Sequence, residues 1–247
     1  MSMDITTEAP LSTRAQRSER PDPSAVWAPL PGLAEAAART ARTGAVAISR
    51  GFDRNSKQRA KALRELLDDQ GVAAIEVTPL PDSERLLAGA EVAAVINLVG
   101  AGSWQPYRLA AKLRAPVLTP NPTADAPAEP AERDVVGVTG EEGERDAALS
   151  HVAVRPEDTE QASLTLTAAG EPLTVPGGWV VITPEQGQLR VQLGGPDYAE
   201  QTFTTGELRV ETADGPHRLV RDEAPIAEFE GSLTFTAEPA GLLVQPV

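Results

Sequence analysis

The sequence has no cysteine and only two histidines, His151 and His217, among its 247 residues. The absence of cysteine excludes disulfide bonds, thiolate metal sites and cysteine nucleophiles. Two histidines this far apart in the sequence argue against a zinc site built from several histidines. Hydrolysis through Ser150 and His151 is also disfavoured, because the glycine-flanked elbow that exposes a serine nucleophile is missing. The chemistry of this chain must therefore be sought elsewhere.

Long apolar runs and an excess of positive charge are absent too. No window approaches the roughly 18–20 apolar residues of a membrane-spanning helix, and residues 1–23 lack the apolar core of a secretory signal. We therefore expect a cytoplasmic protein without a transmembrane segment. The net charge of −14 would repel nucleic acid and anionic membranes, so neither is expected as a partner. The basic residues within Arg50–Arg64 are expected to form a solvated helix face.

The composition changes along the chain and predicts four parts. Residues 1–42 are rich in proline, serine, threonine, alanine and charge, which predicts a disordered or loosely attached arm, with a short helix over Leu33–Ala41. Residues 43–125 are expected to form an α/β domain. Residues 126–149 combine proline, alanine and acidic residues, which is typical of a linker or long loop. Residues 150–247 are expected to form a β-sandwich.

Short apolar runs alternate with helical patterns in the second part. The predicted strands are Ala45–Ser49, Val72–Val77, Val92–Leu98 and Pro116–Thr119. Asn55 and Gln58 resemble a capping box at the start of a helix whose apolar face includes Leu63 and Leu67. Alternating strands and crossover helices indicate a parallel sheet that is covered on both faces.

The last part alternates apolar and polar residues over short runs separated by turn residues. This pattern is typical of half-buried strands in an antiparallel sandwich. The predicted strands are Val152–Arg155, Ser163–Thr167, Trp179–Thr183, Gln188–Leu193, Thr202–Thr204, Glu207–Thr212, His217–Arg221, Ser232–Thr236 and Leu242–Gln245. The expected fold is thus an α/β half with a parallel sheet, followed by an antiparallel β-sandwich.

The most informative stretch is Ala93–Ser103, in which an apolar strand ends in a glycine-rich turn. Trp104–Leu113 follows with the pattern of a helix. The unpaired N–H groups of such a turn and the positive end of a helix form a natural site for an anion. The turn is therefore where a function that handles phosphate is expected.

The order of these features resembles the diacylglycerol kinase and NAD kinase superfamily. Where that family has a strand followed by a GGDGT turn, this chain has Val99–Ser103. Leu118–Asp125 stands at the position of a second motif of the lipid-kinase branch, close to P-x-GT-x-N. Phe229–Ser232 stands at the position of a DGE motif. The resemblance covers residues 44–125 and 200–247, and it supports the fold class expected from the pattern.

The resemblance implies a nucleotide site that takes ATP with Mg²⁺. The cofactor-binding residues that it implies are Gly100, Ala101, Gly102, Ser103, Arg50, Asn121 and Thr123. The acidic position of the GGDGT turn is Ala101 here, and the glutamate of the DGE motif is Ser232. An alanine can neither accept a proton nor hold Mg²⁺. Glu230 and Asp125 remain as weak candidates for a catalytic acid, and no metal ligand is predicted.

Simpler structural roles compete with each of these functional roles. Gly100 and Gly102 can serve a tight strand-to-helix turn only. Ser103 can be the N-cap of the following helix. Arg50 can be solvated, and Asn121 can be an ordinary turn residue. These alternatives stay open from the sequence alone.

Three functions follow from this comparison. The favoured one is a degenerate lipid-kinase-like protein, a pseudokinase that binds a nucleotide or phosphorylated small molecule at the cleft between the two halves without efficient phosphoryl transfer. The second is an active ATP-dependent kinase of diacylglycerol, another lipid or NAD, with its acids supplied from other positions. The third is a structural or interaction subunit that retains only the fold. A homo-oligomer or a protein partner is expected in addition.

Overall fold

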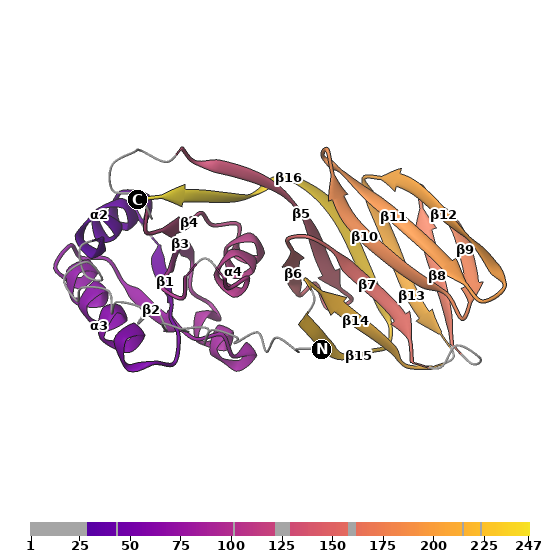
Figure 1. The fold of residues 1–247 in the computed structure, drawn as a ribbon, viewed down its shortest axis with the longest axis horizontal. Coiled ribbons are helices and arrows are strands. Elements are labelled where there is room, and N and C mark those ends of the chain that lie inside the picture. Colours follow the sequence, from indigo (N-terminus) through magenta and orange to yellow (C-terminus); the bar gives the residue numbers. More distant parts are fainter. Residues whose placement is uncertain are drawn as a thin grey trace, which may run out of the picture.

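The computed structural model describes residues 29–42, 44–100, 102–121, 129–157, 162–213, 215–222 and 224–247. Figure 1 shows two halves side by side, one with helices around a short sheet and one made of strands alone. Most of the predicted arm over residues 1–42 lies outside the described residues, and so do Ala101, Thr123 and Asp125. No helix of the described part is both long and apolar enough to cross a membrane.

The first half contains the predicted parallel sheet. Its strands are β1 (Ala45–Ser49), β2 (Ala74–Val77), β3 (Val92–Asn97) and β4 (Val117–Thr119), in the order β2-β1-β3-β4. Its helices are α2 (Leu30–Thr40), α3 (Arg54–Asp68), the short 3-10 helix η1 (Pro81–Leu87) and α4 (Gln105–Leu113). Apolar residues of α2 and α3 pack on one face of the sheet, and those of η1 and α4 pack on the other. The prediction of a parallel sheet covered on both faces is confirmed.

The prediction that helix α3 is capped by Asn55 is wrong, because the helix begins two residues earlier. The N-cap is Asp53, whose Oδ1 accepts a hydrogen bond from the backbone N–H of Ser56 at 2.8 Å. Asn55, expected to cap the helix, lies inside its first turn and is exposed. The carboxylate of Asp53 is the stronger acceptor and already stands where the chain is extended, so it takes the cap position.

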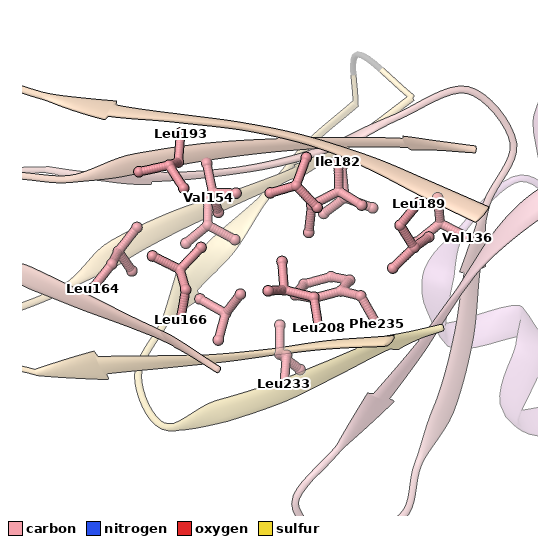
Figure 2. Packing of buried hydrophobic residues seen from close by; sticks show 14 of the residues in the cluster. Val136, Val154, Leu164, Leu166, Ile182, Leu189, Leu193, Leu208, Leu233 and Phe235 are labelled. Carbon is pink, nitrogen blue, oxygen red and sulfur yellow. The ribbon is translucent and has the colours of Figure 1, made fainter. Parts of the chain in front are cut away.

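The second half is the predicted antiparallel sandwich. One sheet has the order β12-β11-β10-β7-β14-β15, and it packs on a second sheet that contains β5 (Ala131–Gly140), β16 (Ser232–Pro246), β13, β8 and β9. The bounds are β7 Val152–Pro156, β8 Ser163–Ala168, β9 Glu171–Pro176, β10 Trp179–Glu185, β11 Gln188–Gly195, β12 Tyr198–Thr205, β13 Glu207–Ala213, β14 His217–Arg221 and β15 Ala224–Phe229. Figure 2 shows the core between them, where Phe235 and Leu208 of one sheet face Ile182 and Leu189 of the other.

The expected linker over residues 126–149 is corrected by the structure. Two strands occupy most of it, β5 (Ala131–Gly140) and β6 (Arg145–Ala148). The apolar residues Val135, Val136 and Val138 of β5 are buried in the cores of the two halves. The strand was not predicted because acidic residues and prolines surround these three valines. The mean composition of the segment is therefore that of a loop.

A ribbon of two long antiparallel strands, β5 and β16 (Ser232–Pro246), joins the halves (Figure 1). At one end, Leu233–Ala237 of β16 pair with β5 inside the sandwich. At the other end, Val244–Pro246 pair in parallel with Val117–Thr119 of β4. The parallel strands and one layer of the sandwich are therefore parts of a single ten-stranded sheet. We call the pair β5 and β16 the connecting ribbon.

Candidate functional site

The carboxyl ends of the parallel strands place the glycine-rich turn next to the connecting ribbon. Ser49 at the end of β1 is in register with Asn97 at the end of β3. Both residues are buried. The Ser49 hydroxyl donates to Oε1 of Gln105, the first residue of α4, at 2.7 Å. The end of β1 therefore holds the start of α4, and with it the turn between β3 and α4.

The turn after β3 is folded around the side chain of Asn97. Oδ1 of Asn97 accepts hydrogen bonds from the backbone N–H groups of Val99 at 3.0 Å and Gly100 at 3.1 Å. Nδ2 donates to the Gly100 carbonyl at 3.3 Å. Gly100 has a φ of 113°, a value that glycine adopts without strain. Two of the N–H groups that could have been offered to a phosphate are thus bonded within the protein.

The start of α4 differs from the prediction. The residue at the N-cap is Trp104, without a side-chain capping bond, so the prediction of Ser103 as N-cap is wrong. Pro106 stands in the first turn and has no N–H to be capped, which reduces the need for a capping side chain. The backbone N–H of Ser103 points back to the Gly100 carbonyl at 3.4 Å. The Ser103 side chain instead borders a pocket.

This pocket, of about 300 Å³, lies between the start of α4 and the connecting ribbon, and we call it the ribbon pocket. Its polar and aromatic lining residues are Ser103, Trp104, Tyr107 and Arg133, and its apolar lining residues are Val135, Leu149, Leu242 and Val244. Trp104 is 53% exposed and therefore does not pack in the core. The ribbon pocket draws residues from both halves, at the cleft where the sequence comparison places a ligand.

The lining of the ribbon pocket suits binding rather than proton transfer. Trp104 and Tyr107 contribute aromatic side chains beside four apolar residues, a composition that suits a planar ring. Arg133 offers a guanidinium fork, which matches a phosphate or carboxylate. No described residue that lines this pocket is an acid or a histidine.

Arg50, one of the predicted cofactor-binding residues, is engaged elsewhere on the sheet edge. Its Nε donates to Oε2 of Glu76 in β2 at 2.7 Å, and its Nη1 donates to the Gly51 carbonyl at 3.0 Å. Arg64 of α3 adds a second cation to Glu76 at 3.4 Å. Arg50 therefore links β1 to β2, and it does not line the ribbon pocket.

The other predicted residues are not gathered at the ribbon pocket. The backbone N–H of Asn121 donates to the Val247 carbonyl at 2.8 Å, beside the pairing of β4 with β16. Glu230 is exposed at the turn before β16, whereas the opposite end of that 15-residue strand lines the pocket. Gly102 is exposed in the turn before α4. No cluster of three or more histidine, aspartate and glutamate side chains that could hold a metal occurs among the residues that the structure describes.

Several pocket residues were not predicted from the sequence. Arg133 and Val135 belong to β5, which was taken for a linker, and Leu242 and Val244 were expected only as core residues of a strand. No local signal shows that these strands return to α4, because that depends on pairing across more than a hundred residues. The role of Asn97 could have been predicted, since an asparagine two or three residues before a glycine is typical of a turn that the asparagine side chain stabilises.

Comparisons with known proteins give a limited result. No family model and no curated protein matches this sequence. The crystal structure of an NAD kinase from Archaeoglobus fulgidus in complex with ATP aligns with 78% of this chain and 90% of its own, at 16% identity and a TM-score of 0.44. Sheep galectin-11 in complex with glycerol aligns with 51% of this chain and 97% of its own, at 11% identity and a TM-score of 0.10. Likenesses this weak carry no argument about the site.

Proposed function

We propose that this protein binds a nucleotide or another phosphorylated small molecule in the ribbon pocket and does not transfer phosphoryl groups efficiently. The observation that carries the proposal is the lining itself, in which Trp104, Tyr107 and Arg133 border one pocket with four apolar residues, next to the glycine-rich turn. The order of motifs in the sequence, which resembles that of the diacylglycerol and NAD kinases, supports a nucleotide as the class of ligand.

Each part of the pocket has a role in the proposed binding. The base stacks on Trp104 and contacts Tyr107, an interaction worth about 1–3 kcal/mol. The Arg133 guanidinium and the Ser103 hydroxyl donate to phosphate oxygens. A volume of about 300 Å³ is at the small end of ligand sites. The pocket therefore suits a mononucleotide better than a dinucleotide.

Efficient phosphoryl transfer is not part of the proposal, because it depends on positioned metal ions and an acid that orients the attacking group. Ala101 stands where the kinase family has its aspartate. Glu230 lies at the far end of β16 from the ribbon pocket. The described residues supply no group of carboxylates for Mg²⁺, so no step through that ion is derived.

Calorimetric titration with AMP, ATP, ATP with Mg²⁺, and NAD tests the proposal. We expect AMP or ATP to bind one site per chain, and Trp104→Ala to weaken binding by about tenfold or more through the loss of stacking. Phe52→Ala is the matched control, because Phe52 is equally exposed, at 55%, on a loop that does not line the pocket. Arg133→Gln should weaken AMP binding and leave adenosine binding unchanged.

Two outcomes contradict the proposal. Absence of heat with every nucleotide at millimolar concentration would remove the ribbon pocket as a nucleotide site. Transfer of labelled phosphate from ATP to diacylglycerol or NAD at an enzymatic rate would show that the protein is an active kinase, the second of the functions that the sequence suggests.

A further inference from the structure

A second pocket borders α4 and shares no lining residue with the ribbon pocket. It has a volume of about 420 Å³ and lies between η1, α4 and the strands β6 and β14. Its charged lining residues are Glu84, Arg85, Arg108, Lys112, Asp146 and Arg221. Four cations thus face two acids in a protein whose net charge is −14. We call this the basic pocket.

Each acid of the basic pocket is already paired with one cation. Nζ of Lys112 lies 2.8 Å from Oε2 of Glu84, and both side chains are largely buried. Arg221 forms an ion pair with Asp146, again between largely buried side chains. The charge of Arg108 is therefore offset by neither acid, so the pocket keeps an excess of positive charge.

Arg221 is the residue that most needs a further partner. Its side chain is 14% exposed, and its Nε is buried without a hydrogen-bond partner among the described residues. Burial and then the neighbouring charge of Arg108 lower the pKa of Arg221 to about 10, although the charges of Glu84 and Asp222 act in the opposite direction. Asp146 offsets the charge of Arg221, but the buried Nε–H still lacks an acceptor and the charge of Arg108 lies nearby, so a further acceptor or anion would be favourable here.

We propose that the basic pocket is a second binding site, separate from the ribbon pocket, for a diphosphate group. Guanidinium groups donate in a planar fork that matches the oxygens of a phosphate, and arginine stays charged at every physiological pH. Arg221 donates through its unused Nε, Arg108 supplies the second fork, and Lys112 adds a compact charge. Two adjacent phosphoryl groups fit a pocket that has cations on both walls. A bound diphosphate would contact η1 and α4 on one side and β14 on the other, and so link the two halves.

Calorimetric titration of the full chain with inorganic pyrophosphate, at constant ionic strength, tests this site. We expect one pyrophosphate per chain, bound at least about tenfold more tightly than orthophosphate, because its second phosphoryl group can reach the cations of the opposite wall. Arg108→Gln should weaken pyrophosphate binding by about tenfold. Arg54→Gln is the control of equal charge change, because Arg54 is exposed at the start of α3 and lines neither pocket.

Two further variants separate this site from a general effect of charge and from the ribbon pocket. Arg221→Lys keeps the positive charge beside Asp146 but removes the Nε donor, and it should still weaken pyrophosphate binding. Arg133→Gln, which removes the cation of the ribbon pocket, should bind pyrophosphate as the parent protein does. Titration of Trp104→Ala with pyrophosphate and with ADP shows which kind of diphosphate the site takes. If the natural ligand is free diphosphate, pyrophosphate should bind at least as tightly as ADP. If the natural ligand is a larger diphosphate ester, ADP should bind more tightly than pyrophosphate.

The proposal fails if pyrophosphate gives no heat at about 10 mM, or if Arg108→Gln and Arg54→Gln weaken binding to the same extent. It also fails if Arg133→Gln abolishes the binding, because the anion would then occupy the ribbon pocket. Thermal unfolding without anion tests whether Arg108→Gln is folded. We expect its melting temperature to equal or exceed that of the parent, because the substitution removes a like charge beside Arg221.

Discussion

The side-chain amide of Asn97 is bonded to the backbone of Gly100 at both of its ends. Oδ1 accepts from the Gly100 N–H at 3.1 Å, and Nδ2 donates to the Gly100 carbonyl at 3.3 Å. The turn is thus held from inside the protein and does not need a ligand to keep its shape. Its role is to position Ser103 and Trp104 at the edge of the ribbon pocket.

Replacing Asn97 by alanine tests this role of the turn. Asn97→Ala leaves the N–H groups of half-buried Val99 and exposed Gly100 without their acceptor, and we expect the free energy of unfolding to fall by about 0.5–1.5 kcal/mol. Urea denaturation measures the change. An unchanged midpoint would show that water replaces the amide and that the side chain does not determine the turn.

The start of α3 gives a second prediction. Asp53→Ala should lower the free energy of unfolding by about 0.5–2 kcal/mol, because the Ser56 N–H loses its capping acceptor. Asn55→Ala is the matched control and should be neutral or slightly stabilising, since alanine is the better helix former at an exposed position. Urea denaturation measures the free energy of unfolding of each variant, and the values are compared where the slopes against urea concentration are equal. A larger loss of unfolding free energy in Asn55→Ala than in Asp53→Ala would show that Asn55 is the N-cap.

Arg145 of β6 fastens α4 to the connecting ribbon. Its Nη1 and Nη2 donate to the two carboxylate oxygens of Glu238, each at 2.6 Å, and its Nε donates to the Lys112 carbonyl at 3.1 Å. We expect Arg145→Gln to lower the free energy of unfolding by roughly 2–4 kcal/mol. Arg114→Gln, which removes a largely exposed cation from the same carboxylate, should cost less than about 1 kcal/mol.

The same pair predicts a dependence on pH. Burial acts to raise the pKa of Glu238, but the hydrogen bonds and charge of Arg145, with a contribution from Arg114, outweigh burial and leave the pKa below its ordinary value of 4.5. The stabilisation is therefore complete above pH 4.5 and is lost as the pH falls through the lowered pKa. The difference in unfolding free energy between the parent and Arg145→Gln should shrink below that pH, and a constant difference would contradict the assignment.

His217 predicts a loss of stability on mild acidification. Its side chain is fully buried in β14, and burial lowers its pKa below the ordinary 6.5 despite the bond between Nδ1 and the Gly215 carbonyl. Below pH 6.5 the unfolded chain binds a proton that the folded chain resists, so stability falls by at most about 1.4 kcal/mol per pH unit. His217→Gln should reduce this slope between pH 7 and 5. A slope that His217→Gln leaves unchanged would contradict the assignment.

The sequence predicts the local elements well and their long-range pairing poorly. Ala45–Ser49 was placed at its observed bounds, because a short apolar run between a glycine and a loop has few other solutions. β16 was expected as two strands, since Pro239 and Gly241 interrupt its pattern. The structure carries the strand through this interruption with an irregularity, at which Ala240 has a φ of 52°.

The site shows the same division between local and distant information. The turn from Gly100 to Ser103 could be located, because strand, glycine and helix follow one another in the chain. The opposite wall of the ribbon pocket could not, because Arg133 and Leu242 reach it only through the pairing of β5 with β16. The basic pocket also escaped the sequence analysis, since Arg108 and Arg221 are 113 positions apart in the numbering and no local pattern relates them.

The position of β16 in the chain has a consequence for synthesis on the ribosome. β4 pairs with β3 on one side, and its other edge pairs with Val244–Pro246, which are translated after every strand of the sandwich. An unpaired edge of this kind invites association with other chains. We therefore expect the nascent N-terminal half to remain a client of chaperones until translation has passed Pro246, although its own helices and strands are complete more than a hundred residues earlier.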